Sequence, residues 1–183
     1  RQHFLGMVAT QPWGPGTFGA DLRLAVSDDA GAAKAGNIDN TTVNGMLSYA
    51  LGGHKVSAAW QQLSGESAFP YVDGADPYLV NFVQINDFAG ADERSWQARY
   101  DYNFAVMGIP GLQLMTRYGH GENATTKAGT NGKEWERDTE VSYTLQSGAL
   151  KNLSLRVNNA TNRRSFNSDF DQTRVIVSYP LSF

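Results

Sequence analysis

Five arginines recur at positions where a two-residue alternation puts them on the polar side of separate strands. They are Arg23, Arg99, Arg117, Arg156 and Arg174. A guanidinium stays charged at any relevant pH and offers a planar fork of donors to a carboxylate. The row therefore predicts binding of carboxylate anions at several successive sites. The alternative is that these arginines pair with acids of the same face, such as Asp21 and Asp101, and only hold the strands together.

A row of four acids is the second pattern that could support chemistry. These acids are Glu134, Glu136, Asp138 and Glu140. Two carboxylates at a suitable separation can hydrolyse a glycoside by acid–base catalysis. No nucleophile–base pair and no oxyanion site accompanies the row, so we interpret it as a solvated acidic rim. The chain has no cysteine, and its three histidines lie on separate predicted strands, so neither a metal site nor a cofactor is expected.

The segment spanning residues 65–92 is longer than an ordinary hairpin connection. Two of its runs, residues 69–71 and 78–80, are rich in apolar side chains that are costly to expose to water. The acids of the segment are Asp73, Asp76 and Asp87. We expect the segment to fold back on the protein, and the alternative is a loop surrounded by solvent.

Both rows depend on β-strands, because a strand sends alternate side chains to opposite faces. The clearest alternation runs from Ser95 to Phe104, with aromatic residues on one face and polar residues on the other. Nine strands are predicted, at residues 2–11, 17–27, 41–51, 54–64, 95–104, 112–119, 134–146, 151–161 and 171–183. Short turns marked by glycine follow every other strand, and longer polar loops follow the rest. This arrangement is typical of bacterial outer-membrane β-barrels.

The composition alone describes a soluble protein, with 41% hydrophobic residues and a mean hydropathy of -0.40. No run approaches the roughly 18 apolar residues that a membrane helix needs, so a spanning structure has to be a closed barrel. Nine strands make an incomplete wall, since single-chain bacterial barrels have an even number. A soluble β-sandwich that binds a ligand is the alternative. The net charge of -3 argues against a nucleic-acid binder.

Both ends of the chain read as strands. The first residues show no signal peptide, so we expect the chain to start after processing or in mid-protein. The last strand alternates up to a terminal aromatic residue, with Val175, Val177, Tyr179, Leu181 and Phe183 on one face. Such an ending resembles the assembly signal of outer-membrane barrels, which implies the barrel-assembly machinery as a partner through Phe183. Aromatic residues near other predicted strand ends suit an interface with outer-membrane lipid.

Several segments resemble one family closely. They are residues 69–88 (FPYVDGADPYLVNFVQINDF), 95–102 (SWQARYDY), 108–112 (GIPGL), 115–118 (MTRY), 132–139 (GKEWERDT) and 146–153 (QSGALKNL). Together they resemble the OprD family, the outer-membrane carboxylate channels. The similarity covers essentially the whole chain and is densest from Asn40 to the end.

This resemblance implies an all-β, antiparallel transmembrane β-barrel of eighteen strands, with residues 1–183 as its C-terminal half. It implies that residues 65–92 fold into the lumen, where Tyr71, Asp73 and Asp76 belong to a constriction. The five arginines resemble the family's basic ladder, although Asn158 stands where the family continues the row with an arginine.

The implied function is passive diffusion of small carboxylate-bearing solutes across the bacterial outer membrane. Amino acids, short peptides and aromatic acids are the expected substrates, and no enzymatic activity is expected. An outer-membrane barrel hydrolase acting through Glu136 or Asp138 is the alternative from the enzyme class.

Overall fold

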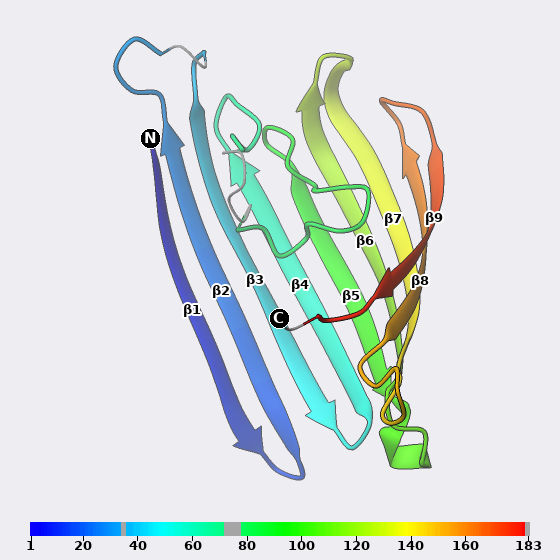
Figure 1. The fold of residues 1–183 in the computed structure, drawn as a ribbon. Coiled ribbons are helices and arrows are strands. Elements are labelled where there is room, and N and C mark those ends of the chain that lie inside the picture. The colour runs from blue at the N-terminus through cyan, green and yellow to red at the C-terminus, as the bar shows by residue number, and fades with distance from the viewer. Residues whose placement is uncertain (34–35, 72–77, 182–183) are drawn as a thin grey trace.

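The computed structural model describes residues 1–33, 36–71 and 78–181, and it consists largely of β-strands (Figure 1). The strands are β1 (Gln2–Trp13), β2 (Gly16–Asp28), β3 (Asp39–Leu51), β4 (His54–Ser64), β5 (Arg94–Asn103), β6 (Leu112–Thr126), β7 (Gly129–Thr144), β8 (Ser154–Arg164) and β9 (Phe170–Ser178). A short 3-10 helix, η1 (Phe104–Met107), follows β5. Each strand pairs antiparallel with the next, in the order β1 to β9.

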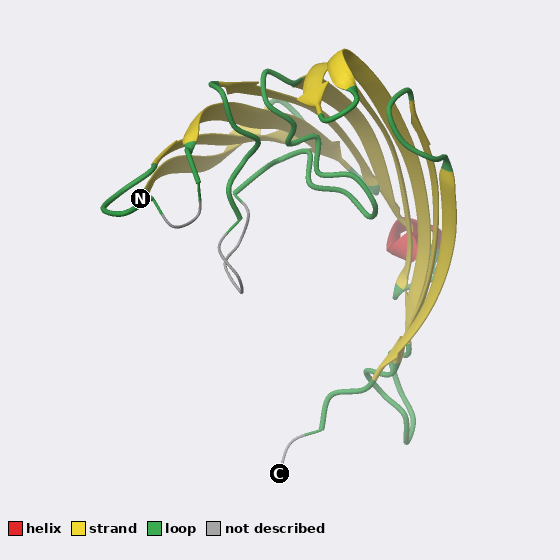
Figure 2. Ribbon diagram, turned by 90° about the horizontal axis from the view of Figure 1, so that it is seen from above, coloured by secondary structure: helices red, strands yellow, loops and turns green. Residues whose placement is uncertain are grey.

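These nine strands form one curved sheet whose edges are β1 and β9 (Figure 2). The prediction of an all-β, antiparallel architecture with nine strands is therefore confirmed. A β-sandwich needs two packed sheets, whereas the strands of the described ranges all belong to a single sheet. In those same ranges, no helix has the length and apolar character to cross a membrane.

The two faces of the sheet differ as the alternation in β5 predicts. Trp96 is 47% exposed on the convex face, whereas the next residue, Gln97, is 2% exposed on the concave face. The register carries this alternation across the sheet, because Trp96 is the cross-strand partner of Trp60 on β4 and of His120 on β6. The convex face thus carries exposed aromatic and aliphatic side chains, while the loop between β4 and β5 lies on the concave side (Figure 2).

Strand lengths differ from the prediction where the alternation fades. β6 and β7 meet in a hairpin at residues 127–128, although a long loop was predicted there, because polar residues of the segment 120–133 continue both strands. Phe104 opens η1 instead of ending β5, since the Asn103 side chain accepts a hydrogen bond of 3.0 Å from the Ala105 amide. The last strand ends at Ser178, and Phe183 lies outside the described residues.

Candidate functional site

The five arginines of the predicted row all lie on the concave face of the sheet. Arg99, Arg117 and Arg156, from β5, β6 and β8, line one cavity of about 530 Å³. Arg174, from β9, shares a neighbouring cavity of about 130 Å³ with Arg117. Arg23, from β2, lies 5.2 Å from the centre of the Tyr78 ring, which belongs to the loop on the concave side. The strand alternation therefore brings guanidinium groups from five strands to one face.

Four of these arginines have a carboxylate partner on the sheet itself. The shortest nitrogen–oxygen distances are 2.8 Å for Arg23–Asp21, 2.6 Å for Arg99–Asp101, 2.6 Å for Arg117–Asp138 and 3.5 Å for Arg156–Glu140. The ion pairs with Asp21 and Asp101, which the alternative interpretation expected, are thus present. The Arg117–Asp138 pair is the most enclosed, with side chains 15% and 3% exposed, whereas Arg156 is 49% exposed.

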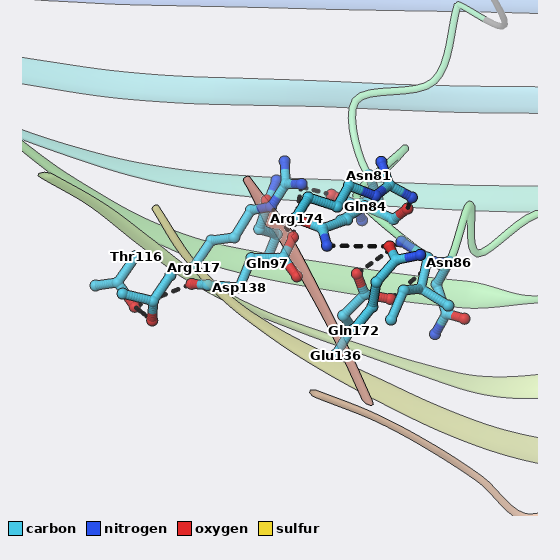
Figure 3. Close-up of polar contacts among 12 residues, drawn as sticks. Asn81, Gln84, Asn86, Gln97, Thr116, Arg117, Glu136, Asp138, Gln172 and Arg174 are labelled. Atoms are coloured by element: carbon cyan, nitrogen blue, oxygen red, sulfur yellow. Dashed lines mark hydrogen bonds and ion pairs between the residues drawn. The ribbon is translucent and has the colours of Figure 1, made fainter. Parts of the chain in front are cut away.

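Arg174 is held in a different way. Its Nη2 donates to the main-chain oxygen of Gln84 at 3.2 Å (Figure 3). Among the described residues it forms no ion pair, and its side chain is exposed. A guanidinium in this position keeps donors and an uncompensated charge for an incoming anion.

The connection between β4 and β5, residues 65–93, is called the long loop below. Its backbone is bonded to side chains of three strands of the concave face. The Val80 amide donates to Asn44 on β3, the Asn81 amide to Gln61 on β4, and the amides of Ile85 and Asn86 to Glu136 on β7. These buried bonds fix the path of the loop, since each leaves a polar group unsatisfied if broken.

Apolar side chains of the long loop are also buried against the sheet. Phe69 and Leu79 pack with Leu63 of β4 and Ala25 of β2 in one cluster. Phe88 is fully buried beside Gly121 of β6, where a side chain would bring its Cβ within 2.7 Å of the phenyl ring. A solvent-surrounded loop, the alternative considered above, is therefore wrong for these residues.

Of the residues predicted for a constriction, Tyr71 is described. It is half exposed, and its hydroxyl donates to the carboxylate of Asp87. Burial, followed by the hydrogen bond and charge of Asp87, raises the pKa of Tyr71. Asp73 and Asp76 lie outside the described residues.

Three of the four acids of the β7 row, Glu134, Glu136 and Asp138, are buried, and Glu140 is partly exposed, so the interpretation of the row as a solvated rim is wrong. Glu136 and Asp138 are 1% and 2% exposed, because the long loop covers the former and Arg117 the latter. Glu134 binds Arg164 of β8 at 3.1 Å. The alternation of side chains could have predicted this burial. It places the acids on the same face as the arginines, and the apolar long loop folds onto that face. In the described ranges, no cluster of three or more histidines or acids is placed to hold a metal ion.

Glu93, at the end of the long loop, was not singled out from the sequence. Its carboxyl group is 1% exposed and accepts a hydrogen bond of 2.8 Å from the Gly90 amide. Burial, and then the charge of Glu134, raises the pKa of Glu93 to about 9. The loop therefore closes on a carboxyl group that is protonated at neutral pH.

Known proteins match this chain over its whole length. The family model described as "outer membrane porin, OprD family" matches residues 1–183. The "Porin-like protein GalP" of Pseudomonas putida is 41% identical over 185 residues, which are 100% of this chain and 44% of that protein. The chain thus spans about half the length of the curated relatives it matches.

Solved structures agree with this match. The crystal structure of OccK5 (OpdH) from Pseudomonas aeruginosa is 57% identical with a TM-score of 0.94, over 97% of this chain and 49% of that one. The structure of OpdK with vanillate, also from Pseudomonas aeruginosa, is 52% identical with a TM-score of 0.95, over 100% of this chain and 48% of that one. The relatives named here are porins and not enzymes. This chain therefore belongs to the OprD family of outer membrane porins, and its location is the bacterial outer membrane.

Proposed function

We propose that this chain forms part of the wall of a channel through which small carboxylate-bearing solutes diffuse passively across the outer membrane. Amino acids, short peptides and aromatic acids are the substrate classes that fit. The observation that carries the proposal is the shared cavity of Arg99, Arg117 and Arg156 on the concave face. OpdK was solved with vanillate, which is the anion of an aromatic carboxylic acid.

The pairing of the arginines suits conduction better than isolated cations would. One carboxylate about 4 Å from a guanidinium gains on the order of 4 kcal/mol at an effective dielectric constant of about 20, before desolvation. A single site of that depth would retain the anion. Asp101 and Glu140 already bind some of the N–H donors of Arg99 and Arg156. A substrate carboxylate therefore exchanges with an existing partner, and it binds each arginine more weakly than it would bind an isolated one.

We extend the proposal to the long loop and to the surroundings of the sheet. The part of the loop formed by residues 65–92 narrows the lumen, with Tyr71, Asp73 and Asp76 near the constriction. Outer-membrane lipid covers the convex face, where Trp60 and Trp96 are exposed. The barrel-assembly machinery recognises the C-terminal segment that ends at Phe183.

The test compares two arginines of opposite faces in the complete polypeptide that carries this chain. Arg156 lines the cavity, whereas Arg137 of β7 is exposed on the convex face and lies 3.4 Å from the Thr161 hydroxyl. Each variant, Arg156→Ala and Arg137→Ala, removes one positive charge. We expect Arg156→Ala to lower the benzoate-to-potassium permeability ratio about two- to fivefold, the range for an exposed ion pair. Arg137→Ala should leave the ratio unchanged.

Reversal potentials in planar bilayers under a benzoate gradient give this ratio. Equal ratios for the wild type and Arg156→Ala would overturn the carboxylate proposal, even where the total conductance changes.

A further inference from the structure

The long loop reaches from β4 to the far edge of the sheet through Gln84. The Gln84 side-chain amide donates to the Gln172 side chain on β9 at 3.1 Å, and the Gln84 main-chain oxygen accepts from Arg174 at 3.2 Å. Figure 3 shows Arg174 and Gln172 meeting the loop at this point. Gln84 therefore contacts β9 twice, once through its side chain and once through its backbone.

Glu136 holds the backbone immediately after Gln84. One carboxylate oxygen accepts from the Ile85 amide at 2.9 Å, and the other accepts from the Asn86 amide at 2.7 Å. Because Glu136 is 1% exposed, water does not compete for these two bonds.

A single peptide unit joins these two sets of contacts. The oxygen that accepts from Arg174 and the N–H group that donates to Glu136 belong to the same planar bond between Gln84 and Ile85. In a trans peptide the two groups point in opposite directions, so fixing the N–H group also fixes the direction of the carbonyl. Two hydrogen bonds at opposite ends of one peptide also polarise each other.

We propose that Glu136 is a positioning residue for carboxylate recognition: it orients the Gln84–Ile85 peptide, whose carbonyl directs the guanidinium of Arg174 toward the incoming anion. The inference rests on the proposed function. Arg174 differs from the four paired arginines because, within the described residues, it forms no ion pair. Binding a substrate carboxylate there displaces no acid of the wall.

The experiment measures the benzoate concentration that half-saturates the current through single channels of the complete polypeptide. Arg174→Ala establishes whether this arginine contributes to the site. Glu136→Gln keeps the size of the side chain and removes one acceptor, so we expect the half-saturating concentration to rise about fivefold, which corresponds to roughly one hydrogen bond. In the Arg174→Ala background, the same change should have no further effect.

Two controls separate positioning from a general loss of structure. Glu122→Gln makes the same substitution at an exposed residue of β6, and it should leave the half-saturating concentration unchanged. Potassium chloride conductance at saturation reports the pore dimensions, and Glu136→Gln should preserve it. Because Glu136 is buried, Gln172→Ala serves as a second variant that loosens Gln84 from the opposite side; we expect about a twofold rise.

The outcomes distinguish the two levels of the proposal. If Arg174→Ala lowers affinity but assembled Glu136→Gln channels keep the wild-type value, the positioning role is overturned and the carboxylate channel stands. An effect of Glu136→Gln that persists unchanged in the Arg174→Ala background also overturns it. If Glu136→Gln does not assemble, a wild-type value for Gln172→Ala overturns it. If Arg174→Ala itself has no effect, Arg174 is no carboxylate site and the inference falls with that part of the proposed function.

Discussion

The concave face has a half that the long loop covers and a half that stays open, and polar groups serve different purposes in the two. Where the loop meets the sheet, Gln61 and Glu136 of the strands and Asn81 of the loop are buried and hydrogen-bonded across the contact. In the open half, Arg99 and Arg156 border a cavity and remain partly exposed beside their acids. One sheet thus supplies a fixed polar network under the loop and exchangeable ion pairs in its open half.

The polar contacts of the two halves also differ in how much each contributes to the free energy of folding. A buried hydrogen bond whose loss strands a polar group carries a penalty of about 1–3 kcal/mol, whereas an exposed ion pair contributes about 0–1 kcal/mol. Substitutions under the loop should therefore release the loop or destabilise the fold. Substitutions in the open half should change which ions pass while the fold persists.

The largest effect is expected at Phe88. Phe88→Ala empties a fully buried site on the sheet, and such truncations cost about 3–5 kcal/mol. Phe82→Ala is the matched control, because Phe82 belongs to the same loop but is 49% exposed. Its cost should stay below about 1 kcal/mol. Cleavage of the long loop by a non-specific protease in detergent micelles measures the difference, since cleavage follows local opening.

We expect the cleavage rate to rise by about two to four orders of magnitude for Phe88→Ala and less than about fivefold for Phe82→Ala. Equal rates for the two variants would contradict the view that the loop is docked by its buried face.

The next effect compares two arginine pairs of neighbouring strands. Arg117→Met leaves Asp138, which is 3% exposed, without its cation, and an unpaired buried charge costs about 3–5 kcal/mol. Arg99→Met leaves Asp101, which is 26% exposed and reaches solvent, so the expected cost is below about 1 kcal/mol. Methionine keeps the aliphatic stem of arginine in both cases.

Denaturant unfolding of the complete polypeptide in detergent, followed by tryptophan fluorescence, gives both free energies. A loss for Arg99→Met as large as that for Arg117→Met would remove the distinction between enclosed and open pairs.

The features of this molecule that could be predicted are those that depend only on neighbouring residues in the sequence. The two-residue alternation of a strand predicts that Trp96 and Arg99 lie on opposite faces of the sheet. This alternation does not depend on what packs against either face. The burial of Glu136 does not follow from its own strand, since a solvated rim and a loop-covered site have the same alternation. Its bonds to Ile85 and Asn86 join residues about fifty positions apart.

The contact of Arg174 with Gln84 is harder still to predict. The two residues are 90 positions apart in the chain, and Arg174 contacts a main-chain carbonyl. Every residue has such a carbonyl. Residue type therefore carries no information about this partner, and only the path of the folded loop decides it. The sequence could predict which face holds the arginines, but it could not predict that Arg174 binds a loop carbonyl and not an acid of the sheet.

The smallest effect, when measured over a single pH unit, is the pH dependence of the covered half. The pKa of Glu93 is raised from an ordinary 4.5 to about 9, mainly by burial and then by Glu134. Between these values the unfolded chain has released a proton that the folded chain keeps, so stability falls as pH rises and levels off above about 9. Glu93 contributes a slope of at most about 1.4 kcal/mol per pH unit, so the change over one unit is smaller than the cost expected for Phe88→Ala or Arg117→Met.

Glu93→Gln tests this origin directly, because glutamine resembles the protonated acid and does not ionise. Between pH 5 and pH 9 the variant should lose less stability than the wild type, and at pH 8 it should be more stable than the wild type. Glu122→Gln, at an exposed position of β6, should retain the wild-type slope. A slope in Glu93→Gln equal to that of the wild type would assign the titration to another group. The long loop would then close on an ionised carboxylate that Arg164, the partner of Glu134, would have to help neutralise.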